Sequence, residues 1–191
     1  MSAFLRSIKD YLSLVKFSHT VFAMPFALIG FTLAVARGNE KFSLRLLLLI
    51  ILCMIFARNA AMGFNRIADK RFDALNPRTR NREIPSGKIS PAAAIVFVIF
   101  NSAFFIITAG FINRLTFLLA PVALSVILGY SLTKRITSLC HFILGLGLSL
   151  APIGAYISVT GQFSLLPVIY SLIVLTWVSG FDIIYSLMDD S

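Results

Sequence analysis

Charged residues are scarce in this chain, and their scarcity excludes most classes of soluble protein. Of the 191 residues, 13% are charged and 58% are hydrophobic, and the mean hydropathy is +0.90. Soluble globular domains carry about 25% charged residues. Because the apolar residues form long runs without charge, the composition indicates a multispanning membrane protein with one bundle rather than several soluble domains.

Other sequence motifs are absent, and their absence excludes further classes of protein. The chain has no Gly-rich nucleotide loop, no nucleophile motif and none of the alternating strands that a transmembrane barrel needs. Its two cysteines, Cys53 and Cys140, both fall in apolar runs, so we expect unpaired packing residues. The net charge of +9 lies in short loops between apolar runs. This placement indicates topology signals and contacts with anionic lipids, and no nucleic-acid binding.

Apolar runs of about 20 residues predict an all-α transmembrane bundle with six spans. We expect the spans near 19–37, 44–66, 89–113, 115–133, 136–158 and 164–181, with an amphipathic interfacial stretch before the first. Twelve Lys and Arg residues lie in the N-terminal tail and in the loops after spans two and four, against four in the opposite loops. This bias predicts a cytoplasmic N-terminus.

Much of the charge that the chain does carry lies between residues 58 and 88. Asn65, Asp69 and Asp73 recur every four residues, so a helix would place them in one stripe of oxygen ligands among many Lys and Arg residues. Carboxylates for a hard cation beside guanidinium and ammonium groups are typical of a site for a metal-bound polyphosphate. The alternative is a cytoplasmic loop with solvated ion pairs.

A second acidic cluster lies near the end of the chain. Asp182, Tyr185 and Asp189 are spaced by three and four residues, again one helical face. The predicted topology places this cluster on the same side as the first, so we expect the two to converge over one cavity. Acidic residues near membrane depth are costly, which favours a functional partner. We expect Mg²⁺ there, holding a prenyl diphosphate whose tail occupies the apolar bundle and whose diphosphate leaves.

These motifs also carry a resemblance. Asn65-xxx-Asp69-xxx-Asp73, NPRT at 76–79, REIPSG at 82–87 and Asp182-xx-Tyr185-Ser186-xx-Asp189 resemble the two aspartate-rich motifs of the UbiA superfamily of intramembrane aromatic prenyltransferases. The bacterial 4-hydroxybenzoate polyprenyltransferase branch is the most similar. KFSHTVFAMPFAL at 16–28 and the segment 130–161 extend the resemblance over essentially the whole chain. The resemblance implies a bundle of nine helices, so residues 1–191 are expected to form one prenyltransferase domain that is incomplete at its C-terminus.

The resemblance implies roles for individual residues. It places Mg²⁺ and the diphosphate on one set of ligands, whose aspartates are also the candidate catalytic residues: Asn65, Asp69, Asp73, Asp182 and Asp189. It adds substrate-binding candidates, of which the basic ones would contact phosphate and the tyrosines would orient the diphosphate or the acceptor: Arg58, Arg82, Lys134, Tyr130 and Tyr185. The family's first motif often reads Asn-Asp where this chain has Asn65-Arg66, so the number of metal-bound carboxylates stays open.

The expected function is Mg²⁺-dependent transfer of a polyprenyl group to a small aromatic acid, such as 4-hydroxybenzoate, in quinone biosynthesis. The expected location is the bacterial inner membrane, with the acidic motifs on the cytoplasmic side. One alternative is a naphthoate-type acceptor of menaquinone synthesis. The other is a transporter, whose intramembrane charges would line a translocation path. The acidic residues gather at one face, which disfavours transport.

Overall fold

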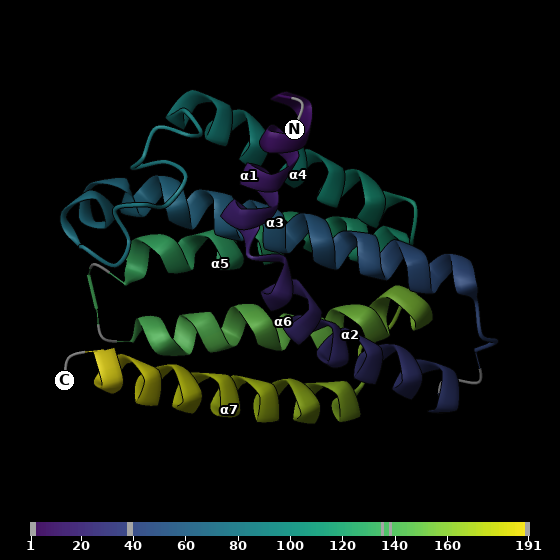
Figure 1. The fold of residues 1–191 in the computed structure, drawn as a ribbon. Helices are drawn as coiled ribbons and strands as arrows, with labels where there is room; N and C mark the ends of the chain where they lie inside the picture. Colours follow the sequence, from purple (N-terminus) through teal and green to yellow (C-terminus); the bar gives the residue numbers. More distant parts are fainter. Residues whose placement is uncertain (1–2, 38–39, 135, 138, 190–191) are drawn as a thin grey trace.

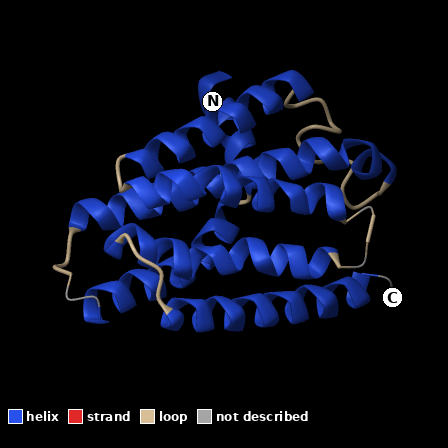
Figure 2. Cartoon of the chain, turned by 180° about the vertical axis from the view of Figure 1, so that it is seen from behind, coloured by secondary structure: helices blue, strands red, loops and turns tan. Residues whose placement is uncertain are grey.

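The protein is all-helical in the part of the chain that the computed structural model describes, as expected (Figures 1 and 2). That part comprises residues 3–37, 40–134, 136–137 and 139–189, without the side chains of 3–8, 17–20, 188 and 189. Its helices are α1 (Ala3–Val15), α2 (Phe17–Arg37), α3 (Leu44–Leu75), α4 (Pro91–Gly110), α5 (Arg114–Thr133), α6 (Cys140–Thr160) and α7 (Leu165–Asp189).

Five of these helices are long and apolar enough to cross a membrane, namely α3, α4, α5, α6 and the segment Leu165–Leu187 of α7. The remaining predicted span lies in α2, where the apolar segment Val21–Arg37 is shorter. Cys53 and Cys140 do not form a disulfide with each other. A polytopic helical bundle is therefore confirmed.

The predicted spans are shorter than several of the helices, because a charge-free run marks the lipid-facing part of a helix and not the helix itself. Helix α3 continues without a break past the predicted end of its span near 66 to Leu75, and α7 continues past 181 to Asp189, as the helical spacing of the two acidic segments predicted. The predicted start of the fifth span at 136 was wrong, since α6 begins at Cys140. At 1.5 Å per residue, the 32 residues of α3 span about 48 Å, more than the roughly 30 Å hydrocarbon core. The polar end of α3 therefore extends beyond the apolar layer.

The helices form two groups that enclose the interior (Figure 1). Helices α3, α4 and α5 pack together, and α6 packs against α2, α5 and α7. The C-terminal ends of α3, α5 and α7 and the start of α6 all lie at one end of the bundle, on the left in Figure 1. We call this end the polar mouth. It holds both acidic segments, so the prediction that they share one side is confirmed for the described residues.

Helix α1 crosses the bundle and covers the connection between α3 and α4. Leu14 and Val15 are buried with Ile84 and Ile89 of that connection. The Ser13 hydroxyl also donates a hydrogen bond to the Glu83 carboxylate. The predicted amphipathic stretch is therefore a helix whose inner face packs on protein at the polar mouth.

One polar contact joins two helices inside the bundle. Amide side chains in apolar spans form hydrogen bonds across helices. The Asn59 amide donates to the Asn101 side-chain oxygen at 3.1 Å, which joins α3 to α4.

Candidate active site

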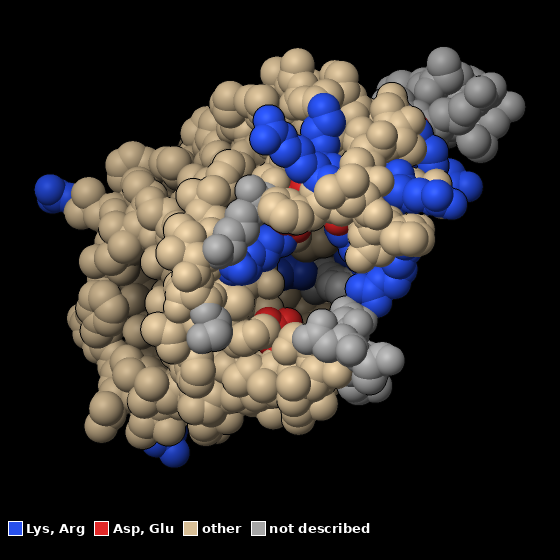
Figure 3. All heavy atoms as spheres, turned by 90° about the vertical axis from the view of Figure 1, so that its left-hand side faces the viewer, with Lys and Arg blue, Asp and Glu red and all other residues tan. Residues whose placement is uncertain are grey.

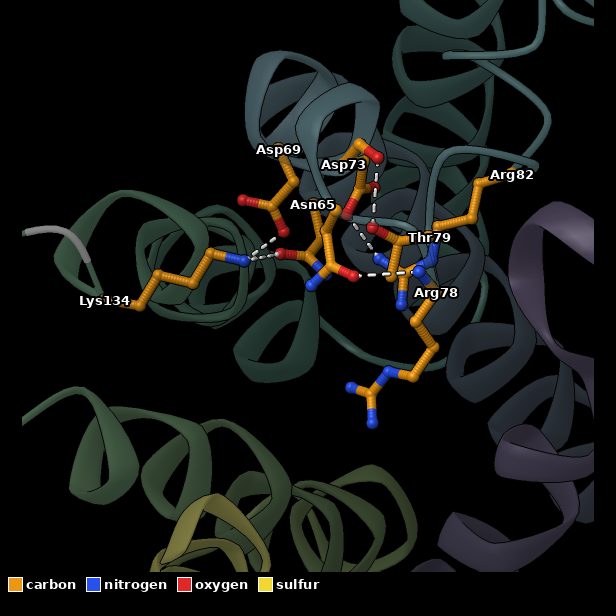
Figure 4. A network of polar contacts seen from close by, with 8 residues as sticks. Asn65, Asp69, Asp73, Arg78, Thr79, Arg82 and Lys134 are labelled. Carbon is orange, nitrogen blue, oxygen red and sulfur yellow. Dashed lines mark hydrogen bonds and ion pairs between the residues drawn. The ribbon is translucent and has the colours of Figure 1, made fainter. Parts of the chain in front are cut away.

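The first acidic stripe lies at the C-terminal end of α3, as its four-residue spacing predicted. From α5, the Lys134 ammonium donates to Asn65 Oδ1 at 2.7 Å and forms an ion pair with the Asp69 carboxylate (Figure 4). Asn65 and Asp69 therefore present their oxygens toward α5. Lys134, predicted as a phosphate contact, lies within reach of any anion that the stripe holds.

Asp73 faces the other way and anchors the connection that follows α3 (Figure 4). Its Oδ1 accepts a hydrogen bond from the Arg82 guanidinium at 2.7 Å, and its main-chain oxygen accepts one from the Thr79 hydroxyl at 3.1 Å. Its Oδ2 is buried without a hydrogen-bond partner among the described residues. A buried carboxylate oxygen without a partner costs free energy, which makes this atom available to a cation.

The second acidic segment reaches the same mouth from α7. Asp182 Oδ2 lies 2.7 Å from Nδ1 of His141 on α6. Tyr130 of α5 lies within electrostatic range of both Asp182 and Asp69. The space-filling view of this end shows a hollow with acidic side chains on opposite walls and Lys and Arg side chains around them (Figure 3).

A cavity of about 220 Å³ extends inward from the mouth. Its wall is mostly apolar, from Ala27 and Ile50 to Leu148, and Asn65 and Tyr130 line it as well. Arg58 is the only Lys, Arg, Asp or Glu among the described residues of this wall. Its Nε is buried without a hydrogen-bond partner among those residues.

Basic residues collect on the side of α3 that faces α1. Arg66 is 4% exposed. Lys16, at the junction of α1 and α2, has a φ of +44°, a backbone conformation that costs free energy for a lysine. Desolvation and the charges of Arg66, Arg82 and Arg78 lower the pKa of the Lys16 ammonium. Such mutual repulsion among cations is relieved by a bound anion.

The donor set fits Mg²⁺ held jointly by protein and substrate. Within the described part of the chain, no three His, Cys, Asp or Glu side chains come close enough together to hold a metal ion by themselves. Mg²⁺, however, is commonly bound through one or two carboxylates plus substrate phosphates. Asp69 and Asp73 on α3 and Asp182 on α7 are oxygen ligands of the required kind, and Oδ2 of Asp73 has no hydrogen-bond partner among the described residues.

The remaining predicted residues vary in position. The Tyr185 side chain is 56% exposed, with its ring packed on Phe181 at 4.6 Å between centroids. The Asp189 side chain lies outside the described residues. The contact between His141 and Asp182 was not predicted from the sequence. The sequence signal for this contact is the spacing of small residues. Ser179 lies three residues before Asp182, and Gly145 lies four residues after His141, so each partner has a small residue one helical turn away.

The fold and the site together define a helical membrane protein with an apolar cavity that opens at the polar mouth, where acidic and basic residues lie. The model of the UbiA prenyltransferase family matches residues 23–190. The chain therefore belongs to the UbiA prenyltransferase family, as the motifs indicated.

The names of the individual relatives indicate different acceptors. The chain is 35% identical over 179 residues to a protoheme IX farnesyltransferase of Azotobacter vinelandii, covering 88% of this chain and 56% of the relative. It is 32% identical over 147 residues to a 4-hydroxybenzoate octaprenyltransferase of Aliivibrio salmonicida, covering 75% and 50%. The chain thus spans about half the length of the curated relatives it matches.

Solved structures support the fold. A UbiA homolog from Aeropyrum pernix K1 in its apo form superposes with a TM-score of 0.80 at 35% identity, covering 90% of this chain and 64% of that one. A UbiA homolog from Archaeoglobus fulgidus bound to GPP and Mg²⁺ gives 0.73 at 21% identity, covering 94% and 63%. At that identity the second likeness concerns the fold alone.

Proposed function

We propose that the protein transfers a polyprenyl group from a polyprenyl diphosphate to a small aromatic acid at the cytoplasmic face of the inner membrane, with Mg²⁺ required. The observation that carries the proposal is the continuity of the apolar cavity with the charged mouth, because Asn65 belongs to both. A molecule with a charged head and a long apolar tail is the substrate that such a site accommodates.

The reaction breaks the bond between the allylic carbon and the diphosphate oxygen, and the electron pair leaves with diphosphate. An aromatic ring carbon then forms the new carbon–carbon bond, and the ring loses its proton to a base. Mg²⁺, when bound, neutralises charge on the leaving diphosphate. Lys134 and Arg82 supply further cationic donors to the phosphate oxygens. The apolar cavity wall keeps water from the allylic cation.

Arg58 supports an acidic acceptor. Arg58 places a guanidinium in a mostly apolar wall, and its buried Nε has no hydrogen-bond partner among the described residues. A carboxylate that accepts two hydrogen bonds matches such a group. We therefore assign Arg58 to the acceptor instead of to the phosphates, for which the sequence had suggested it.

The test incubates the full-length protein, in membranes, with Mg²⁺, a radiolabelled polyprenyl diphosphate and one acceptor at a time. The acceptors are 4-hydroxybenzoate, a hydroxynaphthoate and protohaem, and products are separated by chromatography. We expect prenylation of an aromatic acid that disappears on addition of a chelator. Exclusive prenylation of protohaem would refute the acceptor assignment, and the absence of any prenylated product would refute the enzyme.

A further inference from the structure

His141 contacts Asp182 at the mouth, and the proposed function gives the histidine no role. The two residues are 41 positions apart, on α6 and α7, and both side chains are partly covered, with 22% and 30% exposed. An ionised carboxylate only accepts hydrogen bonds, so the 2.7 Å contact requires a proton on Nδ1 that the imidazole donates to Oδ2.

The packing of α6 on α7 fixes this contact. One turn along α6 from His141, Gly145 lies so close to α7 that a Cβ there would be 2.2 Å from Ser179 Oγ and 2.6 Å from the Leu175 carbonyl oxygen. Ser179 lies one turn before Asp182 on α7. Small residues allow helices to approach closely. A close approach of the two helices therefore lies one turn from the His141–Asp182 pair.

The partner of Asp182 also differs in kind from the partners of the other aspartates. Asp69 and Asp73 are paired with Lys134 and Arg82, which are permanent cations that can serve a diphosphate as well. An imidazole donates its hydrogen bond without a permanent charge and occupies only Oδ2. The contact with the imidazole does not involve Asp182 Oδ1, and it leaves the negative charge of the carboxylate available to a cation.

We propose that His141 is a positioning residue for Asp182. By holding Oδ2, it fixes the rotation of the carboxylate and presents Oδ1 toward the metal-bound diphosphate. Outer partners of this kind orient metal-binding side chains in many proteins. This role rests on the proposed function, since it needs Asp182 to contact the metal and diphosphate.

The test measures Mn²⁺ binding, by electron paramagnetic resonance, to the full-length protein in lipid nanodiscs with inorganic diphosphate present. His141→Ala should weaken Mn²⁺ binding by about 10- to 100-fold, the range found when outer partners of ligands are removed. His141→Asn should retain most of the binding, because its amide nitrogen can donate from nearly the place of Nδ1. Thr176→Ala, on the same helix α7 with its hydroxyl bonded only within that helix, is the matched control and should bind as the parent does.

A double-mutant cycle separates positioning from general damage. In an Asp182→Asn background, His141→Ala should cause no further loss, because the side chain that it orients no longer binds metal. The positioning role would be overturned if His141→Ala caused equal losses in both backgrounds, or if His141→Ala bound Mn²⁺ as the parent does. In either case the proposed site would still stand, provided that Asp182→Asn alone weakened binding. If Asp182→Asn binds Mn²⁺ and diphosphate as the parent does, Asp182 is no ligand, and both the proposed site and this inference fall.

Discussion

At the scale of single residues, Lys134 joins the end of α5 to the first acidic stripe on α3. Its ammonium contacts both Asn65 and Asp69 of α3 from the end of α5. In the proposed reaction it donates to a phosphate oxygen as negative charge develops there, and removal of one such donor typically costs 10²- to 10³-fold in rate. Lys134→Met should therefore lower kcat by about that factor with the fold intact, measured as prenylated product per enzyme. Lys41→Met, an exposed lysine at the opposite end, is the control and should keep full activity.

Arg58 should affect the acceptor and not the prenyl donor. Hydrogen bonds to charged groups contribute about 1.5–3 kcal/mol, so Arg58→Met should raise the acceptor KM by roughly 10- to 100-fold. The KM of the prenyl diphosphate should change little, because the guanidinium lies in the cavity wall seven residues before Asn65. Steady-state kinetics with each substrate varied in turn make the distinction. An equal rise in both KM values would contradict this assignment and indicate that Arg58 contacts the phosphates.

Lys16 combines two unfavourable features, a left-handed backbone and repulsion by Arg66, Arg82 and Arg78. Strain of this kind is concentrated at functional sites. Asparagine tolerates the left-handed region and carries no charge, so Lys16→Asn should raise the unfolding temperature by about 1–3 °C. It should also weaken binding of inorganic diphosphate several-fold, by calorimetry. A variant that is less stable, or that binds diphosphate as the parent does, would contradict a role for Lys16 in anion binding.

The lowered pKa of Lys16 gives a pH dependence with a defined sign. The folded protein disfavours the charged Lys16 ammonium, so this charge lowers the free energy of unfolding at pH values below the pKa of Lys16 in the folded state. The loss is relieved as the pH rises through that pKa and the ammonium is deprotonated. A bound polyphosphate favours the ammonium and reverses the shift. Diphosphate binding should therefore take up protons at pH values near the folded pKa, and less so in Lys16→Asn. Calorimetry in buffers of different ionisation enthalpy measures this uptake.

At the scale of elements, the α6–α7 contact is a close backbone approach at Gly145. An added methyl group has no room there, and overpacking of this kind costs about 1–3 kcal/mol. Gly145→Ala should lower the unfolding temperature by several degrees, and it should also weaken the His141–Asp182 contact. Gly180→Ala is the matched control on α7, since a Cβ there meets nothing within 4 Å. Equal unfolding temperatures for the two variants would show that the approach is looser than described.

The sequence predicted the helical elements more fully than their ends and contacts. Charge-free runs and the four-residue spacing of Asn65, Asp69 and Asp73 placed the spans and the first stripe, because each depends on local periodicity. The spacing of Asp182, Tyr185 and Asp189 predicted the continuation of α7 past Phe181 in the same way. The start of α6 at Cys140 has no such local signal, because its N-cap residue Leu139 makes no side-chain capping hydrogen bond. The His141 contact depends on the relative register of two helices, which no spacing within one helix encodes.

At the scale of the whole molecule, the account requires that the polar mouth faces the cytoplasm. In a variant without Cys53 and Cys140, a cysteine at Ser86 should resist a membrane-impermeant maleimide applied to intact spheroplasts. A cysteine at Gln162, in the turn between α6 and α7 at the other end, should react. The reverse pattern would invert the predicted topology.

The central claim is that Asp69 of α3 and Asp182 of α7 act on one diphosphate at the polar mouth. The most direct measurement is a crystal structure of the full-length protein with Mn²⁺ and an unreactive prenyl thiolodiphosphate, in which anomalous scattering locates the metal. The account predicts Mn²⁺ and the diphosphate between these two aspartates, with the prenyl chain entering the cavity beside Asn65. Metal and diphosphate bound away from either aspartate, or a prenyl chain outside that cavity, would contradict it.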